Sequence, residues 1–118
     1  MFVRRNASVS SWVGHKDYAH RIGVAIAFLR PNREGLPYPD EGEVMNRIED
    51  SLCAVFEKNQ GAVQVLAITT KGMREFVFYS RDPSLVNSIA EVSPEFPDYE
   101  LTHYATEDRE WTWFHEFS

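Results

Sequence analysis

The sequence predicts a single α+β domain of the ferredoxin-like class, a β-α-β-β-α-β sandwich with two helices on one face of a four-stranded antiparallel sheet. The decisive observation is a hairpin. Residues 62–70 and 73–80 both alternate apolar side chains at the two-residue period of a strand, and Lys71-Gly72 between them suits a tight turn. One strand and one helix are predicted before this hairpin, and one helix and one strand after it.

The strand before the hairpin is predicted over residues 20–30. One of its faces is entirely large and apolar, formed by Ile22, Val24, Ile26 and Phe28. The other face is also apolar, formed by Gly23, Ala25, Ala27 and Leu29. A strand with two apolar faces is expected in the middle of a sheet that is covered on both sides.

The first helix is predicted over residues 41–58, after a loop that holds three prolines. Asp40 is the expected N-cap, and Glu43 stands three residues later, as in a capping box. Its apolar residues recur at the spacing of one buried helix face and are Val44, Ile48, Leu52, Val55 and Phe56.

The second half supplies the remaining elements. Asp82-Pro83 predicts the start of a short helix over 83–92, and alternation predicts an outer strand over 98–105. An aromatic tail follows, with a helical turn capped by Thr106 or Asp108. At the other end, Ala7–Val13 suggests an additional edge strand. We therefore expect one domain over 1–118, with a core of 19–117 and an N-terminal segment, 1–18, that is hard to place.

The second face of such a sheet has no helix to cover it. The central strands would nevertheless place large apolar side chains there, and monomers rarely expose a large apolar patch. We expect the ends of the chain to cover this face, in preference to a second subunit in a homodimer or a ligand.

Composition and charge narrow the classes of function. The net charge is −6, and the segment from Glu91 onward holds eight acids against Arg109 alone. Such a field attracts basic partners and repels nucleic acid. The single cysteine, Cys53, excludes an internal disulfide, and there is no apolar run long enough to span a membrane. We expect a cytoplasmic protein.

No residue pattern predicts catalysis, a cofactor or a metal. The histidines lack the spacing of zinc ligands, there is no glycine-rich phosphate loop, and Cys53 falls near the buried face of the first helix. The hairpin KGMREFVFY only loosely resembles an RNA-binding submotif, because Met73 stands where an aromatic residue belongs. An enzyme is less expected than a binding protein, and nucleic acid is not an expected partner.

The favoured hypothesis is a small binding or regulatory module. It would engage a basic protein through its acidic C-terminal half, Glu95 to Glu116. Aromatic anchors inside a charged rim concentrate binding energy at interfaces. The candidate residues are Trp111 and Trp113 as anchors, with Glu107, Asp108 and Glu110 around them.

Two alternatives remain open. A small-molecule binder or enzyme would have its pocket on the open face of the sheet, with Tyr79, His103 and Tyr104 as candidate polar groups. A structural homodimer would instead pair two copies through that face.

Four pieces of the chain are similar to a bacterial family, the domain-of-unknown-function 695 family. They are GLPYPDE, MNRIEDSL, TKGMREFVFYSRD and DREWTWFHEF, and together they extend from about Arg21 to Phe117. Members of this family occur fused to, or resemble in fold, regulator of ribonuclease E activity B, an acidic protein that inhibits RNA decay by binding the ribonuclease. The resemblance implies a ferredoxin-like fold, no established activity and no catalytic residues.

Overall fold

The computed structural model describes residues 2–6, 17–58 and 61–116 of the chain. Within them, one open antiparallel sheet of five strands has the order β1-β3-β4-β2-β5. The strands are β1 (Phe2–Arg5), β2 (His20–Ala27), β3 (Ala62–Thr70), β4 (Met73–Ser80) and β5 (Leu101–Glu107). The helices are α1 (Pro39–Phe56), α2 (Ile89–Val92) and α3 (Thr112–His115), with 3-10 turns η3 (Pro83–Ser88) and η4 (Ser93–Glu95) on either side of α2.

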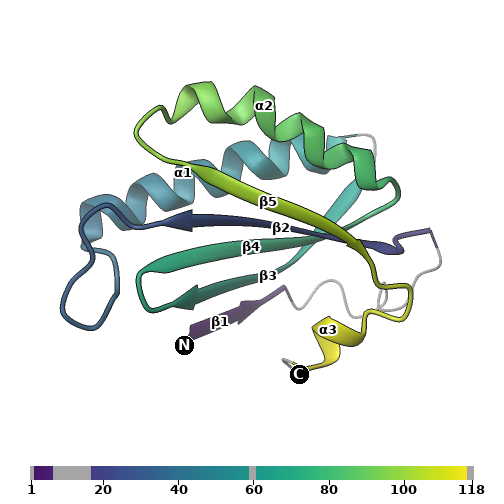
Figure 1. Ribbon diagram of the computed structural model, residues 1–118, viewed down its shortest axis with the longest axis horizontal. Helices are drawn as coiled ribbons and strands as arrows, with labels where there is room; N and C mark the ends of the chain where they lie inside the picture. Colours follow the sequence, from purple (N-terminus) through teal and green to yellow (C-terminus); the bar gives the residue numbers. More distant parts are fainter. Residues whose placement is uncertain (1, 7–16, 59–60, 117–118) are drawn as a thin grey trace.

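The helices are divided between the two faces of the sheet. α1 and α2 lie over one face, and α3 lies on the opposite side near the C-terminus (Figure 1). The protein is thus of the mixed α and β class, as predicted. The sheet has five strands where the sequence predicted four, because Phe2–Arg5 adds an edge strand along β3. The edge strand expected over Ala7–Val13 lies outside the described residues.

The hairpin is confirmed, with β3 and β4 at the predicted bounds. Gly72 has φ +89°, which favours glycine at this turn. The strict alternation predicted along β3 is wrong, because the register shifts between Gln64 and Leu66. This bulge moves Leu66 onto the face opposite Ala62, so residues expected to share one face are divided between two.

α1 begins two residues earlier than predicted, at Pro39, and also ends two residues earlier, at Phe56. Tyr38 is the N-cap, Pro39 occupies the first helical position, and no side chain caps the helix. The expectation of an Asp40 cap with Glu43 is therefore wrong. The proline fixes a helical φ where no N–H partner is needed, which leaves Asp40 and Glu41 in the first turn, where the helix dipole favours acids.

The remaining elements differ from prediction mainly at their ends. β2 ends at Ala27, and β5 begins and ends later than the predicted strand. The predicted helix 83–92 is largely a 3-10 helix followed by one α turn. Its predicted start is confirmed, since the Asp82 carboxylate accepts a hydrogen bond from the N–H of Ser84 at 2.9 Å.

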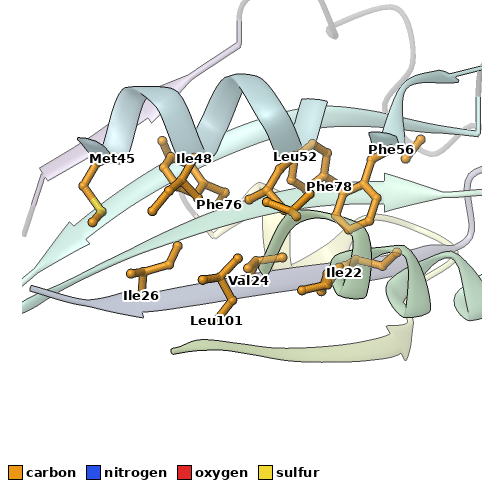
Figure 2. Packing of buried hydrophobic residues seen from close by; sticks show 14 of the residues in the cluster. Ile22, Val24, Ile26, Met45, Ile48, Leu52, Phe56, Phe76, Phe78 and Leu101 are labelled. Carbon is orange, nitrogen blue, oxygen red and sulfur yellow. The ribbon is translucent and has the colours of Figure 1, made fainter. Parts of the chain in front are cut away.

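The main core fills the space between α1 and the sheet. The side chains of α1 point down onto the strands, and those of β2 and β4 point up to meet them (Figure 2). We call this set the helix-face core: Ile22, Val24, Ile26, Met45, Ile48, Leu52, Phe56, Phe76, Phe78 and Leu101. The face predicted from Ile22, Val24 and Ile26 is confirmed, because all three are fully buried.

Candidate functional site

The aromatic tail packs on the opposite face of the sheet. The indole of Trp111 stacks on the ring of Tyr79, with centroids 4.1 Å apart and planes at 11°. Phe114 packs beside Trp111 at 5.9 Å. We call the buried set on this face the tail cluster: Tyr18, Val65, Leu66, Ile68, Val77, Tyr79, Trp111 and Phe114. The chain's own C-terminal segment therefore covers part of the second face, as expected.

Polar contacts hold the tail in place. The Trp111 indole N–H donates to the carbonyl of Tyr18 at 2.8 Å, and the Tyr79 hydroxyl donates to the Asp108 carboxylate at 2.7 Å. The same carboxylate accepts the N–H groups of Thr112 and Trp113, which begin α3. Asp108 thus joins β4 to the first turn of the tail helix. It accepts N–H groups of that turn, as a cap would, but the N-cap position predicted for Thr106 or Asp108 is held by Trp111.

These contacts shift the pKa values of Tyr79 and Asp108. Burial, together with the Asp108 carboxylate, raises the pKa of the Tyr79 hydroxyl, so Tyr79 remains a hydrogen-bond donor. Burial alone would raise the pKa of Asp108. The hydrogen bonds from Tyr79, Trp113 and Thr112, with the charge of Arg21, outweigh burial and lower that pKa below its usual value.

Arg21 lies at the border of the tail cluster. Its guanidinium carbon is 4.6 Å from the ring centroid of Trp113 and 5.5 Å from that of Tyr104. One of its terminal nitrogens is 3.7 Å from the Asp108 carboxylate. Its Nε is buried without a hydrogen-bond partner among the described residues. Arg21 therefore contacts the rings of Trp113 and Tyr104 by cation–π interactions and also faces the Asp108 carboxylate.

The structure brings together four of the predicted site residues, Tyr79, Asp108, Trp111 and Trp113, and gives them unequal exposure. Trp111 is fully buried, so it packs the tail and offers no surface to a partner, contrary to its predicted role as an interface anchor. Trp113 is half-buried and Asp108 is occupied by internal hydrogen bonds.

The other predicted residues lie along β5 and just after it. Glu107 and Glu110 are exposed, and Glu107 pairs with Arg109 at 3.0 Å. His103 is exposed and follows the face of the sheet that carries the helices, since it pairs in register with Val24. It therefore lies on the opposite face from Tyr79, and the two do not form one pocket.

The acids of the C-terminal half are exposed as a group. Seven of the eight acids from Glu91 onward are exposed, and they lie on α2, on η4, at both ends of β5 and beside α3. The only base in this segment, Arg109, is engaged with Glu107. We call this set the acidic surface: Glu91, Glu95, Asp98, Glu100, Glu107, Glu110 and Glu116.

A groove that the sequence did not predict opens at the start of α1. Its volume is 1020 Å³, and it is lined by Leu29, Arg30, Tyr38, Pro39, Asp40, Glu41, Glu43, Val44, Arg47 and Tyr99. Leu29 and Tyr38 expose more than half of their surface there. The proline-rich segment GLPYPDE was the available signal, because four of its residues, Tyr38, Pro39, Asp40 and Glu41, line this groove.

Glu41 forms the floor of this groove. Its buried carboxylate accepts the N–H of Leu29 at 2.7 Å and the Tyr99 hydroxyl at 2.8 Å. Burial and the carboxylate raise the pKa of Tyr99 to about 12. Glu41 therefore joins the loop after β2 to the turn before β5, and its charge is used inside the protein.

Cys53 is a free cysteine and a nucleophilic residue type. Burial and the nearby Glu57 raise the pKa of the Cys53 thiol to about 12, so the thiolate is scarce. Among the described residues, no group of three histidine, cysteine or acidic side chains could hold a metal ion. None of the helices in the described part of the chain is long and apolar enough to cross a membrane.

The comparisons with known proteins agree with the family resemblance of the four sequence pieces. Of these pieces, GLPYPDE forms the loop at the groove and DREWTWFHEF forms the tail. The whole chain, residues 1–118, matches the model of a family of unknown function, DUF695. The chain belongs to this family. No curated protein and no solved structure matches it. The DUF695 match therefore names relatives without naming an activity, and the function must be argued from the surface.

Proposed function

We propose that this DUF695 protein is a small binding module that engages a basic protein partner through its acidic surface. The observation that carries the proposal is the exposure of seven acids from Glu91 onward in a segment whose one base is already paired. Exposed carboxylates in excess of basic groups accelerate and orient the approach of a positively charged partner.

The apolar contribution to binding would come from residues beside these acids. Trp113 is half-buried next to Glu110, and Tyr104 is partly exposed on β5 between Glu100 and Glu107. Partly exposed aromatic side chains surrounded by polar groups are frequent sources of interface energy. Trp111 has no direct part in this proposal and supports the surface from inside.

A pocket on the open sheet face receives less support. The tail occupies the end of that face near Tyr79, whose hydroxyl is bonded to Asp108. His103 lies on the other face. An enzymatic site built on both residues receives no support, because the sheet lies between them.

The experiment that tests the proposal compares matched charge removals. The double variant E107Q/E110Q removes two acids of the acidic surface, and E34Q/D50N removes two exposed acids elsewhere. Both variants have the same net charge. Each would serve as bait in a native-host lysate at low and high salt, with nuclease present.

We expect a basic protein that is captured by the wild type and by E34Q/D50N, is retained less by E107Q/E110Q, and is released by high salt. Equal capture by both variants would show that general charge, and not the acidic surface, is responsible.

We also infer that β5, β2, β4 and β3, with α1 and the α2 region, form a ferredoxin-like arrangement to which β1 is added. The support is the order of the strands. β2 and β4 lie side by side at the centre, β3 lies outside β4, and β5 lies outside β2, as expected for that class. An experimental structure superimposed on known ferredoxin-like domains would test this inference.

A further inference from the structure

The outer edge of β5 is the feature that extends the proposed function. β5 is the last strand in the order of the sheet, and in the part of the chain that the structure describes no strand pairs with its outer edge. Six of its seven residues, Thr102–Glu107, are exposed. α2 and η3 therefore leave most of this strand uncovered.

The direction of the backbone groups follows from one hydrogen bond. The N–H of Asp108 donates to the carbonyl of Ala19 at 2.7 Å, which continues the register of β5 with β2 by one residue. In an antiparallel pair, hydrogen-bonded positions alternate. The even-numbered residues of β5 therefore bond to β2. The residues that direct their N–H and C=O groups outward are Leu101, His103, Ala105 and Glu107.

This edge lacks the features that usually prevent further pairing. Natural edge strands are protected by proline, lysine, bulges or short length. β5 has seven residues with neither proline nor lysine, whereas β1 at the other edge has four residues, two of them arginine. The unprotected edge of the sheet is thus the one that lies within the acidic surface.

Charge indicates what would pair there. Glu100 directly precedes the strand and Glu107 ends it, roughly 24 Å apart at the rise of an antiparallel strand. A second copy of β5 would bring its own acids into this field, and like charges across strands are destabilising. An extended segment rich in lysine or arginine would be attracted instead.

We propose that a basic, extended segment of a partner protein adds to the sheet as a sixth strand along the outer edge of β5. The outward N–H and C=O groups would supply the main-chain hydrogen bonds, and the acidic surface would select for basic side chains. This inference rests on the proposed function and names the way in which the partner is held.

The test uses a synthetic peptide that alternates lysine and threonine. Ala105→Pro removes an outward N–H without removing a bond to β2, and Ala105→Ser is the matched control that keeps the N–H. We expect A105P to weaken binding by roughly tenfold, since each lost hydrogen bond contributes a modest net amount, and A105S to bind as the wild type. Amide exchange at His103 and Ala105 should slow when the peptide is bound.

A second arm leaves the protein unchanged, in case A105P does not fold. Two versions of the peptide carry N-methyl groups on alternate residues. One version blocks the N–H groups of the lysines, and the other blocks those of the threonines. Strand addition uses one set only, so one version should lose binding and the other should keep it. Equal binding of both versions, or of A105P and A105S in folded form, would overturn the strand-addition inference.

The outcomes separate this inference from the proposed function. If the unmodified peptide binds and E107Q/E110Q weakens it while A105P does not, only strand addition is wrong. If the peptide does not bind while the lysate capture depends on Glu107 and Glu110, strand addition is wrong and the proposed function stands. If the free protein is a dimer that A105P dissociates, the edge belongs to a second copy and the proposed occupant is wrong.

Discussion

The two faces of the sheet are covered in different ways. Under α1, the helix-face core consists of aliphatic and phenyl side chains from regularly spaced positions, and Phe56 meets Phe78 edge to face at 4.9 Å. On the other face, the tail cluster depends on one stacked pair, Tyr79 and Trp111, and on hydrogen bonds that reach from the tail to β4 and Tyr18.

This difference indicates different modes of unfolding. Removing α1 would expose the helix-face core, which joins the helix to the strands. This core should therefore unfold together with the whole domain. The tail is a terminal segment attached by a few contacts, and such segments can open locally at a lower free energy than global unfolding. The contrast can be tested by weakening each face separately.

The largest effect is expected in the helix-face core. Leu52→Ala deletes a fully buried side chain and leaves a cavity that the regular packing around α1 cannot close. We expect the free energy of unfolding to fall by about 3 kcal/mol, measured by urea denaturation followed by circular dichroism.

Val55→Ala on the same helix is the control, because Val55 is only half-buried. The free energy of unfolding should fall clearly less in V55A than in L52A. Equal losses would mean that burial against the sheet is not what makes Leu52 stabilising, because alanine does not lower the helix propensity at either position.

A smaller effect on global stability is expected at the tail. Trp111→Ala removes the ring stacked on Tyr79 and the indole N–H that donates to Tyr18. Because the tail can detach by itself, the loss of unfolding free energy cannot exceed the free energy with which the tail docks. We expect a loss of about 2 kcal/mol. The near-ultraviolet circular dichroism of Tyr79 should change while the far-ultraviolet spectrum of the sheet is kept.

Trp113→Ala serves as the comparison, because Trp113 is half-buried at the border of the tail cluster and its ring faces Arg21. A cooperative loss of the whole fold in W111A would contradict the view of the tail as a separately docked unit. It would place both faces in one cooperative core.

The same contrast explains what the sequence could predict. The helix-face core was predictable because its residues repeat at the periods of a strand and a helix, as with Ile22, Val24 and Ile26. The bulge at Gln64–Leu66 was not, since nothing in the alternation of β3 indicates an extra residue. The cap of α1 was assigned to Asp40 because its side chain suits that position, whereas Pro39 decided the start.

The candidate site was only partly predictable for a related reason. The residues Tyr79, Asp108, Trp111 and Trp113 were singled out by type, and the structure brings them together. Sequence could not show which of them is buried, because Trp111 adopts a left-handed φ of 56° that turns it onto Tyr79. The groove beside Tyr38 was missed because it is formed by Tyr99 from a distant turn.

The smallest of the three effects is expected for Asp108→Asn, and it depends on pH. The folded protein lowers the pKa of this carboxyl, because the hydrogen bonds from Tyr79 and from the N–H groups of α3 outweigh its burial. The unfolded value of this pKa is about 3.9. A carboxyl whose pKa is lower in the folded state stabilises the fold, and its full contribution is present at pH values above the unfolded pKa. This contribution is lost as the pH falls through the folded pKa.

We therefore expect D108N to lower the free energy of unfolding by about 1.5 kcal/mol near neutral pH, the range of a hydrogen bond to a charged group. The difference between D108N and wild type should shrink below about pH 4, where the carboxyl of the unfolded chain begins to be protonated. Urea denaturation at several pH values measures it, with E110Q as a control in which an exposed acid is removed. A difference that stays constant down to acidic pH would show that Asp108 stabilises the tail through the geometry of its hydrogen bonds and not through its charge. The tail would then differ from the helix-face core only in its specific contacts, and not in its response to pH.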